Sequence, residues 1–394
     1  MVCIYVRKAM TGDGKTVISP AWILVEDGKI ISIGKNKPAF DGRVIELNGI
    51  TVIPGLLNMH DHICRKTLRV PDESISFGSR TAQFMSQSHE ALILYSAHNM
   101  RNYLLEEGIT WVRDYGLAGT TSITLDRAIR SGIAIGPELE CCAVPICTTG
   151  GHCYKQSHEA DGVPEVLKAV RHQAEQGAKI IKFMCSGGLE HFPREIPSNP
   201  EFTLEELTMG VSAAKDLGLQ TAIHAYSHEA VRRGILAGVN SIEHGALISD
   251  DQVLLMAEKN ISFVPTMSGI RAAFSSGPNQ QYWDRLTEEI FSKQENAIRA
   301  AHEAGVLIGA GTDSLGYLFD EIRLIGRTLG KSPIQAIAHA TSINAKIAGR
   351  EDLGELAVGK RANIVGFVGD LEESLDFLDG GASFVMKDGI VYKE

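Results

Sequence analysis

Apolar runs of strand length alternate with longer amphipathic segments from about residue 51 to residue 350. The amphipathic segments have the length of helices and include residues 90–107, 163–177, 204–218, 227–238, 250–259 and 286–305. The apolar runs are TVIPGLLNMH, ITWVRD, ELECCAVPIC, KIIKFMC, LQTAIH, NSIEH, ISFVP and VLIGAGTD. Strands that alternate with helices indicate βαβ units and a parallel sheet. Eight such units close into a barrel more readily than they form an open sheet, so the pattern predicts an α/β fold with a (β/α)8 TIM barrel.

The two ends of the chain have a different pattern, with short strands separated by turn signals. Near the N-terminus, CIYVRKAM precedes AWILVEDGKIISIG, which has Asp27-Gly28 at its centre. Near the C-terminus, ANIVGFVG precedes SFVMKDGIVYKE, which contains Asp388-Gly389. Asp-Gly between two apolar runs is a strong signal for a β-hairpin. The simplest arrangement is a small β-domain of residues 1–53 plus 351–394 beside a barrel of residues 54–350.

Composition and charge limit the kinds of partner. Of the 394 residues, 44% are hydrophobic and 22% charged, as in soluble globular proteins with a large core. The formal net charge of −10 argues against a nucleic-acid surface and favours a small-molecule partner. The first residues lack the features of a signal peptide, and no apolar run reaches membrane-spanning length. We therefore expect a cytoplasmic protein that binds no membrane, and we also expect a homo-oligomer.

Polar residues close five of the apolar strands, at the end of the barrel where active sites of such folds lie. The first strand ends in His60-Asp61-His62, and because side chains alternate along a strand, His60 and His62 share one face. In the fourth strand, the same alternation makes Lys182 rather than Lys179 the residue that reaches the barrel mouth from inside. The remaining candidates close the fifth, sixth and eighth strands and are His224, His244 and Asp313.

Taken singly, each of these residues has a structural explanation. A strand-end histidine is more often a hydrogen-bonded structural residue, and Asp313 could cap the next helix. Convergence from five strand ends favours a shared metal site instead. A buried lysine among histidines is costly as a cation and would be repelled by metal ions. The neutral amine of Lys182, however, could add carbon dioxide to form a carbamate, which is an anionic ligand able to bridge two metals.

In this order, the motifs resemble those of the amidohydrolase superfamily, in its branch with a binuclear centre and a carboxylated lysine. PGLLNMHDH is similar to the family's PGLIDxHxH, and KIIKFMCSGG to its strand-four IKxxxSGG. HAY and EHG are similar to its histidine strands, and GTD to its final strand. The combination is specific, although each motif alone would be weak. The resemblance covers nearly the whole chain and implies that the terminal strands form a β-sandwich.

The resemblance also implies two divalent metal ions and a role for each ligand. His60, His62 and Asp313 would hold the more buried ion, His224 and His244 the more exposed ion, and carboxylated Lys182 would bridge them. Zinc suits imidazole and carboxylate ligands, and such sites also accept cobalt or manganese. Two metals at roughly 3.5–4 Å would generate a bridging hydroxide at neutral pH. Asp313 would then be the general base that accepts its proton.

Two further motifs resemble the branch of imidazolonepropionase-related peptidases, which includes prolidases and arginine or lysine carboxypeptidases. GGH after the third strand ends in His152, and HAY ends in Tyr226. The resemblance implies that both contact substrate, and His152 is a second candidate for the proton transfer. The loop after the fourth strand carries Arg194, which could bind a substrate carboxylate as a bidentate fork, although exposed loop arginines are usually only solvated.

The leading interpretation is hydrolysis of an amide or peptide bond in a small substrate, such as a dipeptide or an N-acyl amino acid. Lactone or carbamate cleavage, or deamination, is the nearest alternative, because one scaffold serves many reactions. Deaminases of this superfamily usually have a mononuclear centre without the strand-four lysine, so Lys182 weighs against deamination. A non-enzymatic scaffold is the third class, but such relatives tend to have lost metal ligands, and all six positions are filled here.

Overall fold

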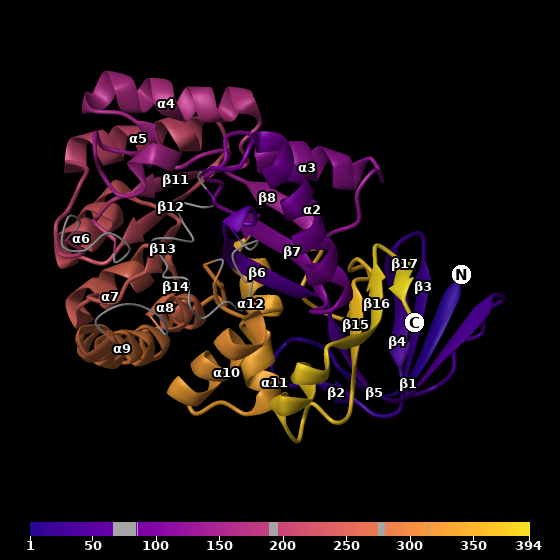
Figure 1. Cartoon of the computed structure of the whole chain (residues 1–394). Helices are drawn as coiled ribbons and strands as arrows, with labels where there is room; N and C mark the ends of the chain where they lie inside the picture. The colour runs from indigo at the N-terminus through magenta and orange to yellow at the C-terminus, as the bar shows by residue number, and fades with distance from the viewer. Residues whose placement is uncertain (66–83, 85, 189–195, 275–279, 314) are drawn as a thin grey trace.

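The computed structural model describes residues 1–65, 84, 86–188, 196–274, 280–313 and 315–394. These residues form a (β/α)8 barrel and a small β-sandwich, which lie side by side (Figure 1). One cluster of buried apolar side chains fills the barrel and continues into strands of the sandwich, and a second cluster lies within the sandwich. The predicted fold class is therefore confirmed.

Parallel strands form the barrel wall, in two hydrogen-bonded groups. One group has the order β6 (Leu56–Asp61), β7 (Ile109–Asp114), β8 (Glu138–Cys141). The other has the order β10 (His158–Glu159), β9 (Ile146–Cys147), β11 (Ile180–Met184), β12 (Gln220–Ala225), β13 (Ser241–His244), β14 (Ser262–Val264). The strands of the wall are almost entirely buried, which explains why the sequence shows them as continuous apolar runs. A backbone hydrogen bond from Lys179 to Cys141 joins the two groups.

The segment predicted as the eighth strand closes the barrel without forming a regular strand, so the prediction is wrong in this detail. Residues 306–313 share a single bridge with β14. A backbone hydrogen bond from Met59 to Ala310 connects the segment to β6. The chain passes very close to β6 here, because a Cβ at Gly311 would lie 2.7 Å from the His60 Cβ. This tight packing against β6 replaces a regular ladder.

The third predicted strand is also interrupted. The run from residue 138 to residue 147 forms β8 and β9 with Ala143 between them, and Ala143 has a φ of 58°. A residue in the left-handed region cannot continue an extended strand, so the single predicted strand becomes two. Gly116 accommodates the bend, since a Cβ there would lie 2.0 Å from the Ala143 carbonyl oxygen.

Helices cover the outside of the barrel (Figure 1). They are α2 (His89–Leu105), α3 (Thr121–Arg130), α4 (Gly162–Gln176), α5 (Leu204–Asp216), α6 (His228–Ala237), α7 (Asp250–Glu258), α8 (Met267–Phe274), α9 (Gln280–Glu303), α10 (Leu318–Thr328), α11 (Pro333–Ala338) and α12 (Ser342–Ile347). Short 3-10 turns are η2 (Tyr154–Gln156) and η3 (Leu375–Gly380). Local signals set the ends: Thr203 and Glu206 form a capping box at the start of α5, and Gly177 and Gly238 adopt left-handed conformations after α4 and α6.

Strands from both ends of the chain share one sheet in the sandwich. Their order is β17 (Ile390–Lys393), β16 (Ala382–Lys387), β15 (Ile364–Val368), β5 (Arg43–Pro54), β1 (Val2–Met10), β3 (Ala21–Glu26), β4 (Lys29–Gly34), with β2 (Val17–Ile18) beside β1. Both predicted hairpins are confirmed. Asp27-Gly28 joins β3 to β4 and Asp388-Gly389 joins β16 to β17, all four residues with positive φ. The exact domain boundaries stay a prediction.

A cluster of ion pairs ties the start of β8 to the sandwich. Glu138 accepts from Arg350 at 2.6 Å and from Arg361 at 2.5 Å, and Arg361 also pairs with Asp388 in the β16–β17 turn. Burial acts to raise the pKa of Glu138, but the two guanidinium groups outweigh it and hold that pKa below its usual range. Glu138 is thus the shared anion between the barrel and the sandwich.

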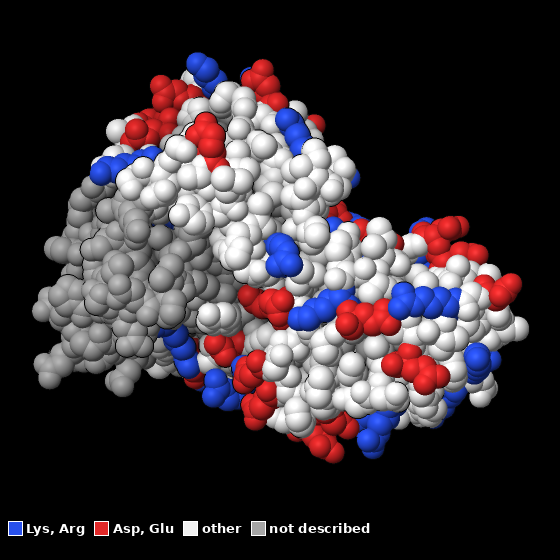
Figure 2. Space-filling model, turned by 45° about the vertical axis from the view of Figure 1, so that its right-hand side comes forward, with Lys and Arg blue, Asp and Glu red and all other residues white. Residues whose placement is uncertain are grey.

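The face in Figure 2 carries mixed charge. Over the part of the chain drawn in colour and white, acidic and basic side chains are interspersed and do not gather into one patch. Among the described residues, no helix combines the length and the apolar character needed to cross a bilayer.

Glu138→Gln is expected to lower the free energy of unfolding by about 1–3 kcal/mol, because two guanidinium groups lose their shared anion. Its side chain is 24% exposed, so solvent screening keeps the loss toward the lower end. Chemical denaturation measures the change. The control is Glu175→Gln, at a side chain that is 76% exposed, where the change should stay within about 0.5 kcal/mol. Equal stability of the two variants would contradict this role for Glu138.

Candidate metal centre

Three of the predicted ligands lie within reach of one cation. The ligand atoms of His60, His62 and Asp313 are all within 4.8 Å of one another. The Asp313 Oδ1 lies 3.4 Å from the Nε2 atom of each histidine. Alternation along β6 brings both imidazoles to one side, as the sequence predicted, and Asp313 reaches them from the barrel-closing segment.

The second predicted pair lies beside the first. Parallel strands β12 and β13 carry His224 and His244, whose ring centroids are 4.7 Å apart. The His244 ring is also 5.0 Å from the ring of His60. The four histidines therefore form one continuous cluster at the carboxyl ends of the strands, which is where active sites of such barrels lie.

Lys182 projects into the same region from the barrel interior. It is buried, and its Nζ lies 4.0 Å from the ring centroid of Tyr115, whose ring is in turn 4.6 Å from that of His60. Burial lowers the pKa of the Lys182 amine. The neutral amine is the form that adds carbon dioxide, so this environment favours the reaction that the sequence suggested.

Backbone conformation brings His244 and Asp313 into the cluster. Ser241 and Glu243 share one face of β13, so simple alternation would direct His244 to the opposite face. His244 instead has a φ of 68°, and Asp313 has a φ of 47°. Non-glycine residues rarely adopt positive φ, and they do so preferentially at functional sites. Here the left-handed conformation occurs at two predicted ligands, His244 at the end of β13 and Asp313 at the end of the barrel-closing segment.

The predicted ligands have the unsatisfied atoms that a metal would need. Four buried nitrogen atoms of this cluster have no hydrogen-bond partner among the described residues, namely His60 Nε2, His62 Nδ1, Lys182 Nζ and His224 Nε2. Buried polar atoms are nearly always paired, so a group of such atoms in one cluster calls for a ligand. A pair of divalent cations suits a set of imidazole, amine and carboxylate donors.

The protonation states also suit metal binding. Burial lowers the pKa of His62 to about 4 and holds the pKa values of His224 and His244 well below their usual range. These imidazoles are neutral at pH 7, which is the form that binds metals. Burial acts to raise the pKa of Asp313, but the adjacent imidazoles of His60 and His62 outweigh it and hold that pKa well below the usual range. Asp313 is therefore an ionised carboxylate.

Several polar residues around the ligands were not predicted from the sequence. Glu243 Oε2 lies 2.7 Å from His60 Nδ1, and Thr266 Oγ1 lies 2.7 Å from His244 Nδ1. Asp61, which the alternation directs away from the cluster, accepts from Asn58, Thr312 and Tyr103. The available signal for Glu243 was an acidic residue inside an otherwise apolar barrel strand.

The predicted substrate contacts lie next to the second histidine pair. The ring of His152 stacks on that of His224 with centroids 4.2 Å apart, and the ring of Tyr226 stacks on that of His244 at 5.3 Å. His152 is also packed against Gly188, where a Cβ would lie 2.1 Å from the His152 Cε1. The third predicted contact, Arg194, falls outside the described residues.

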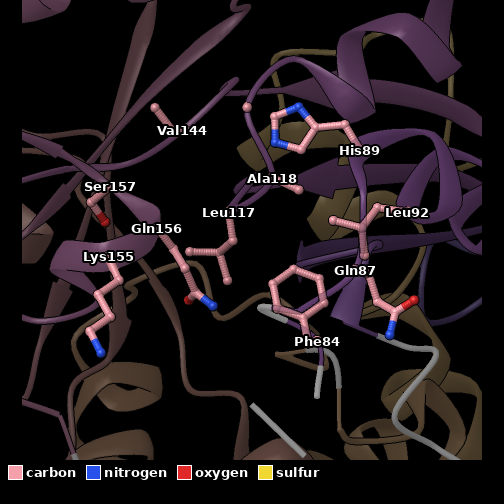
Figure 3. A pocket seen from close by; sticks show the side chains of 11 residues that line it. Phe84, Gln87, His89, Leu92, Leu117, Ala118, Val144, Lys155, Gln156 and Ser157 are labelled. Carbon is pink, nitrogen blue, oxygen red and sulfur yellow. The ribbon is translucent and has the colours of Figure 1, made fainter. Parts of the chain in front are cut away.

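A pocket of about 260 Å³ lies between α2, the loops after β7 and β8, and η2, and none of the six predicted ligands lines it. Figure 3 shows Lys155 and Gln156 on one side of the pocket and His89 and Leu92 on the other. Its apolar lining belongs to the same buried cluster as Met184, which follows Lys182 by two residues on β11.

Comparison with known proteins adds independent evidence. A model of the amidohydrolase family matches residues 51–391. Ochratoxinase from Aspergillus niger is 27% identical over 399 aligned positions, which cover 92% of this chain and 80% of that protein. Imidazolonepropionase from Symbiobacterium thermophilum is 24% identical over 379 positions, covering 89% and 84%. The crystal structure of a Xaa-Pro dipeptidase with methionine bound in the active site has a TM-score of 0.86 and 29% identity, covering 100% of both chains.

Lys182→Ala is expected to reduce the metal content of zinc-loaded protein, because it removes the ligand that both ions would share. Added acetate or formate should restore part of the metal and part of the activity by replacing the lost carboxylate. Elemental analysis after gel filtration measures the zinc bound per chain. Lys179→Ala is the matched control: Lys179 is 37% exposed and pairs with Asp126, so its loss should leave the metal content unchanged. Equal zinc content in both variants and the parent protein would refute the bridging role.

Proposed function

The chain belongs to the amidohydrolase family and is a hydrolase, and on this premise we propose that it cleaves an amide or peptide bond of a small substrate with the help of two divalent metal ions. Substrates of this kind are dipeptides and N-acyl amino acids. The observation that carries the proposal is the group of buried, unpaired nitrogen atoms on His60, His62, Lys182 and His224, close to the ionised carboxylate of Asp313.

The proposed ligand assignment follows the two neighbouring groups. The more buried ion is held by His60, His62 and Asp313, the more exposed ion by His224 and His244, and both by carboxylated Lys182. Zinc is the first choice for these donors, with cobalt and manganese as alternatives. When bound, two such ions supply an activated water molecule and polarise the scissile carbonyl group.

Asp313 is proposed as the general base. Its side chain is 27% exposed, whereas that of His60 is fully buried. One carboxylate oxygen, Oδ1, lies 3.4 Å from the Nε2 atoms of His60 and His62, and part of the side chain stays exposed. An ionised carboxylate in this position can accept a proton from the attacking water and return it to the leaving amine.

The substrate's leaving portion is proposed to carry a free carboxylate, bound by His152 and Tyr226. Both rings are stacked against the second histidine pair, so their positions are fixed by packing. A carboxylate that leaves water needs charge-assisted hydrogen bonds, or its desolvation cancels the binding. The similar Xaa-Pro dipeptidase holds methionine in its active site, and methionine is a free amino acid with such a carboxylate.

Asp313→Asn is expected to reduce turnover by roughly 10²–10⁴-fold, because the amide keeps the shape of the side chain but cannot accept the proton. Circular dichroism should show an intact fold, and steady-state kinetics on the metal-loaded protein measures the loss. A rate close to that of the parent protein would show that another group, with His152 as the first candidate, transfers the proton.

A substrate screen tests the proposed function itself. Metal-loaded protein is assayed against dipeptides, N-acyl amino acids, lactones and carbamates, and each active acid is compared with its C-terminal amide. We expect activity on the first two classes, and we expect amidation to lower kcat/KM by more than roughly tenfold, about 1.4 kcal/mol. Equal turnover of acid and amide would exclude carboxylate recognition. Activity on lactones or carbamates alone would replace amide hydrolysis with the alternative chemistry.

A further inference from the structure

Glu243 lies directly behind one of the proposed metal ligands. It is fully buried in β13, and its Oε2 lies 2.7 Å from His60 Nδ1. The other carboxylate oxygen accepts hydrogen bonds from the hydroxyl of Ser241 at 2.6 Å and from the hydroxyl of Tyr115 at 3.1 Å. Three partners therefore fix the position of this carboxylate: His60 in β6, Ser241 in β13 and Tyr115 directly after β7.

The contact with Glu243 determines which nitrogen atom of the neutral His60 ring carries the proton. A carboxylate at Nδ1 keeps the proton on that nitrogen, which leaves the lone pair on Nε2. Nε2 points toward Asp313, whose Oδ1 is 3.4 Å away, and it has no hydrogen-bond partner in the described part of the chain. The tautomer that Glu243 favours is thus the one that directs a free lone pair of His60 into the site formed by His60, His62 and Asp313.

The negative charge of Glu243 would also be offset by metal ions bound at the proposed site. Among the described residues, the Glu243 carboxylate pairs with His60, and no lysine or arginine forms a salt bridge with it. Lys182 Nζ is the nearby amine, but it lies over the ring of Tyr115 and makes no hydrogen bond to the carboxylate. A buried carboxylate that no lysine or arginine contacts in a salt bridge retains part of its desolvation cost. Positive charge bound by His60 would offset that cost.

We propose that Glu243 is a positioning residue for the more buried metal ion: it holds His60 in the Nδ1-protonated form with Nε2 toward the cation. Its negative charge also strengthens His60 as a ligand. Tyr115 and Ser241 hold the carboxylate of Glu243, and the ring of Tyr115 also covers Lys182. Tyr115 therefore links the carboxylate behind His60 to a second proposed ligand, Lys182. This inference rests on the metal centre of the proposed function. Loss of an outer carboxylate of this kind typically weakens metal affinity by about 10–100-fold.

Cobalt(II) titration of the full chain, followed by visible absorption and by competition with a chelator, tests the proposal. Two variants separate charge from hydrogen bonding: Glu243→Gln keeps an acceptor but loses the charge, and Glu243→Met loses both at similar size. Affinity at the buried site should fall in the order parent, Gln, Met, with a loss of at least tenfold for Met. Repeating the titration in a His224→Ala background reads the buried site alone, because that change removes a ligand of the other ion.

Tyr115→Phe should have a smaller effect than Glu243→Met, because it removes one support of the carboxylate and leaves the carboxylate in place. The matched control is Glu321→Gln. Glu321 is also a fully buried carboxylate, but it accepts from the backbone N–H groups of Met267 and Ser268, so its loss should leave cobalt affinity unchanged. Unchanged affinity in Glu243→Met, with two cobalt ions still bound, would overturn the role of Glu243 and leave the metal centre standing.

Nitrogen-15 NMR of histidine-labelled, zinc-loaded parent protein gives a result that does not depend on any Glu243 variant folding. His60 is assigned by the signal lost in His60→Gln. We expect its Nδ1 to carry a proton that exchanges slowly with solvent, and its Nε2 to carry none. A proton on Nε2 instead would overturn the proposal. If the parent protein bound no cobalt or zinc at all, the metal centre would fail together with this inference.

Discussion

The carbonyl oxygen of His60 accepts backbone hydrogen bonds from both Thr312 and Asp313, at 2.9 Å and 3.0 Å. This contact closes the barrel between its first strand and its last segment. It also fixes the Asp313 side chain within reach of His60 and His62. The contact that closes the barrel therefore also places the carboxylate of the site formed by His60, His62 and Asp313.

The backbone is strained at three positions in and around the site. Positive φ angles at His244, Thr266 and Asp313 cost on the order of 1–3 kcal/mol each. The surrounding core and hydrogen bonds hold these conformations, and Thr266 in turn hydrogen-bonds the ring of His244. The strained backbone at His244 lets its side chain leave the alternation of β13 and join the histidine cluster, and Asp313 reaches this cluster from a segment that is not a regular strand.

Alternation was sufficient to predict the positions of His60 and Lys182, which lie within regular strands, and of His62, which directly follows β6, because parity along a strand determines the face. It could not predict Glu243. In β13, His244 was expected to face the mouth, which would have placed Glu243 outside, and the left-handed backbone at His244 allows both to face inward. Such a backbone conformation has no reliable signal in a single sequence.

The same limit explains the two strand predictions that were wrong. Ala143 and Gly311 lie in apolar runs whose composition fits a strand, and long-range contacts decide their conformation. Contacts of this kind depend on which segments become neighbours after folding. The hairpins, in contrast, were predictable because Asp-Gly favours positive φ through local sterics alone.

The pairing of β5 with β15 has a consequence for how the protein is made. Pro54 lies opposite Ile364, so β5 finds this neighbour only after almost the whole chain has been synthesised. During translation, the hydrogen-bonding edge of β5 is open while the barrel emerges from the ribosome, and open strand edges are where chains pair wrongly. The sandwich is thus the last part of the molecule to reach its final form, and its edge is what a chaperone would need to shield.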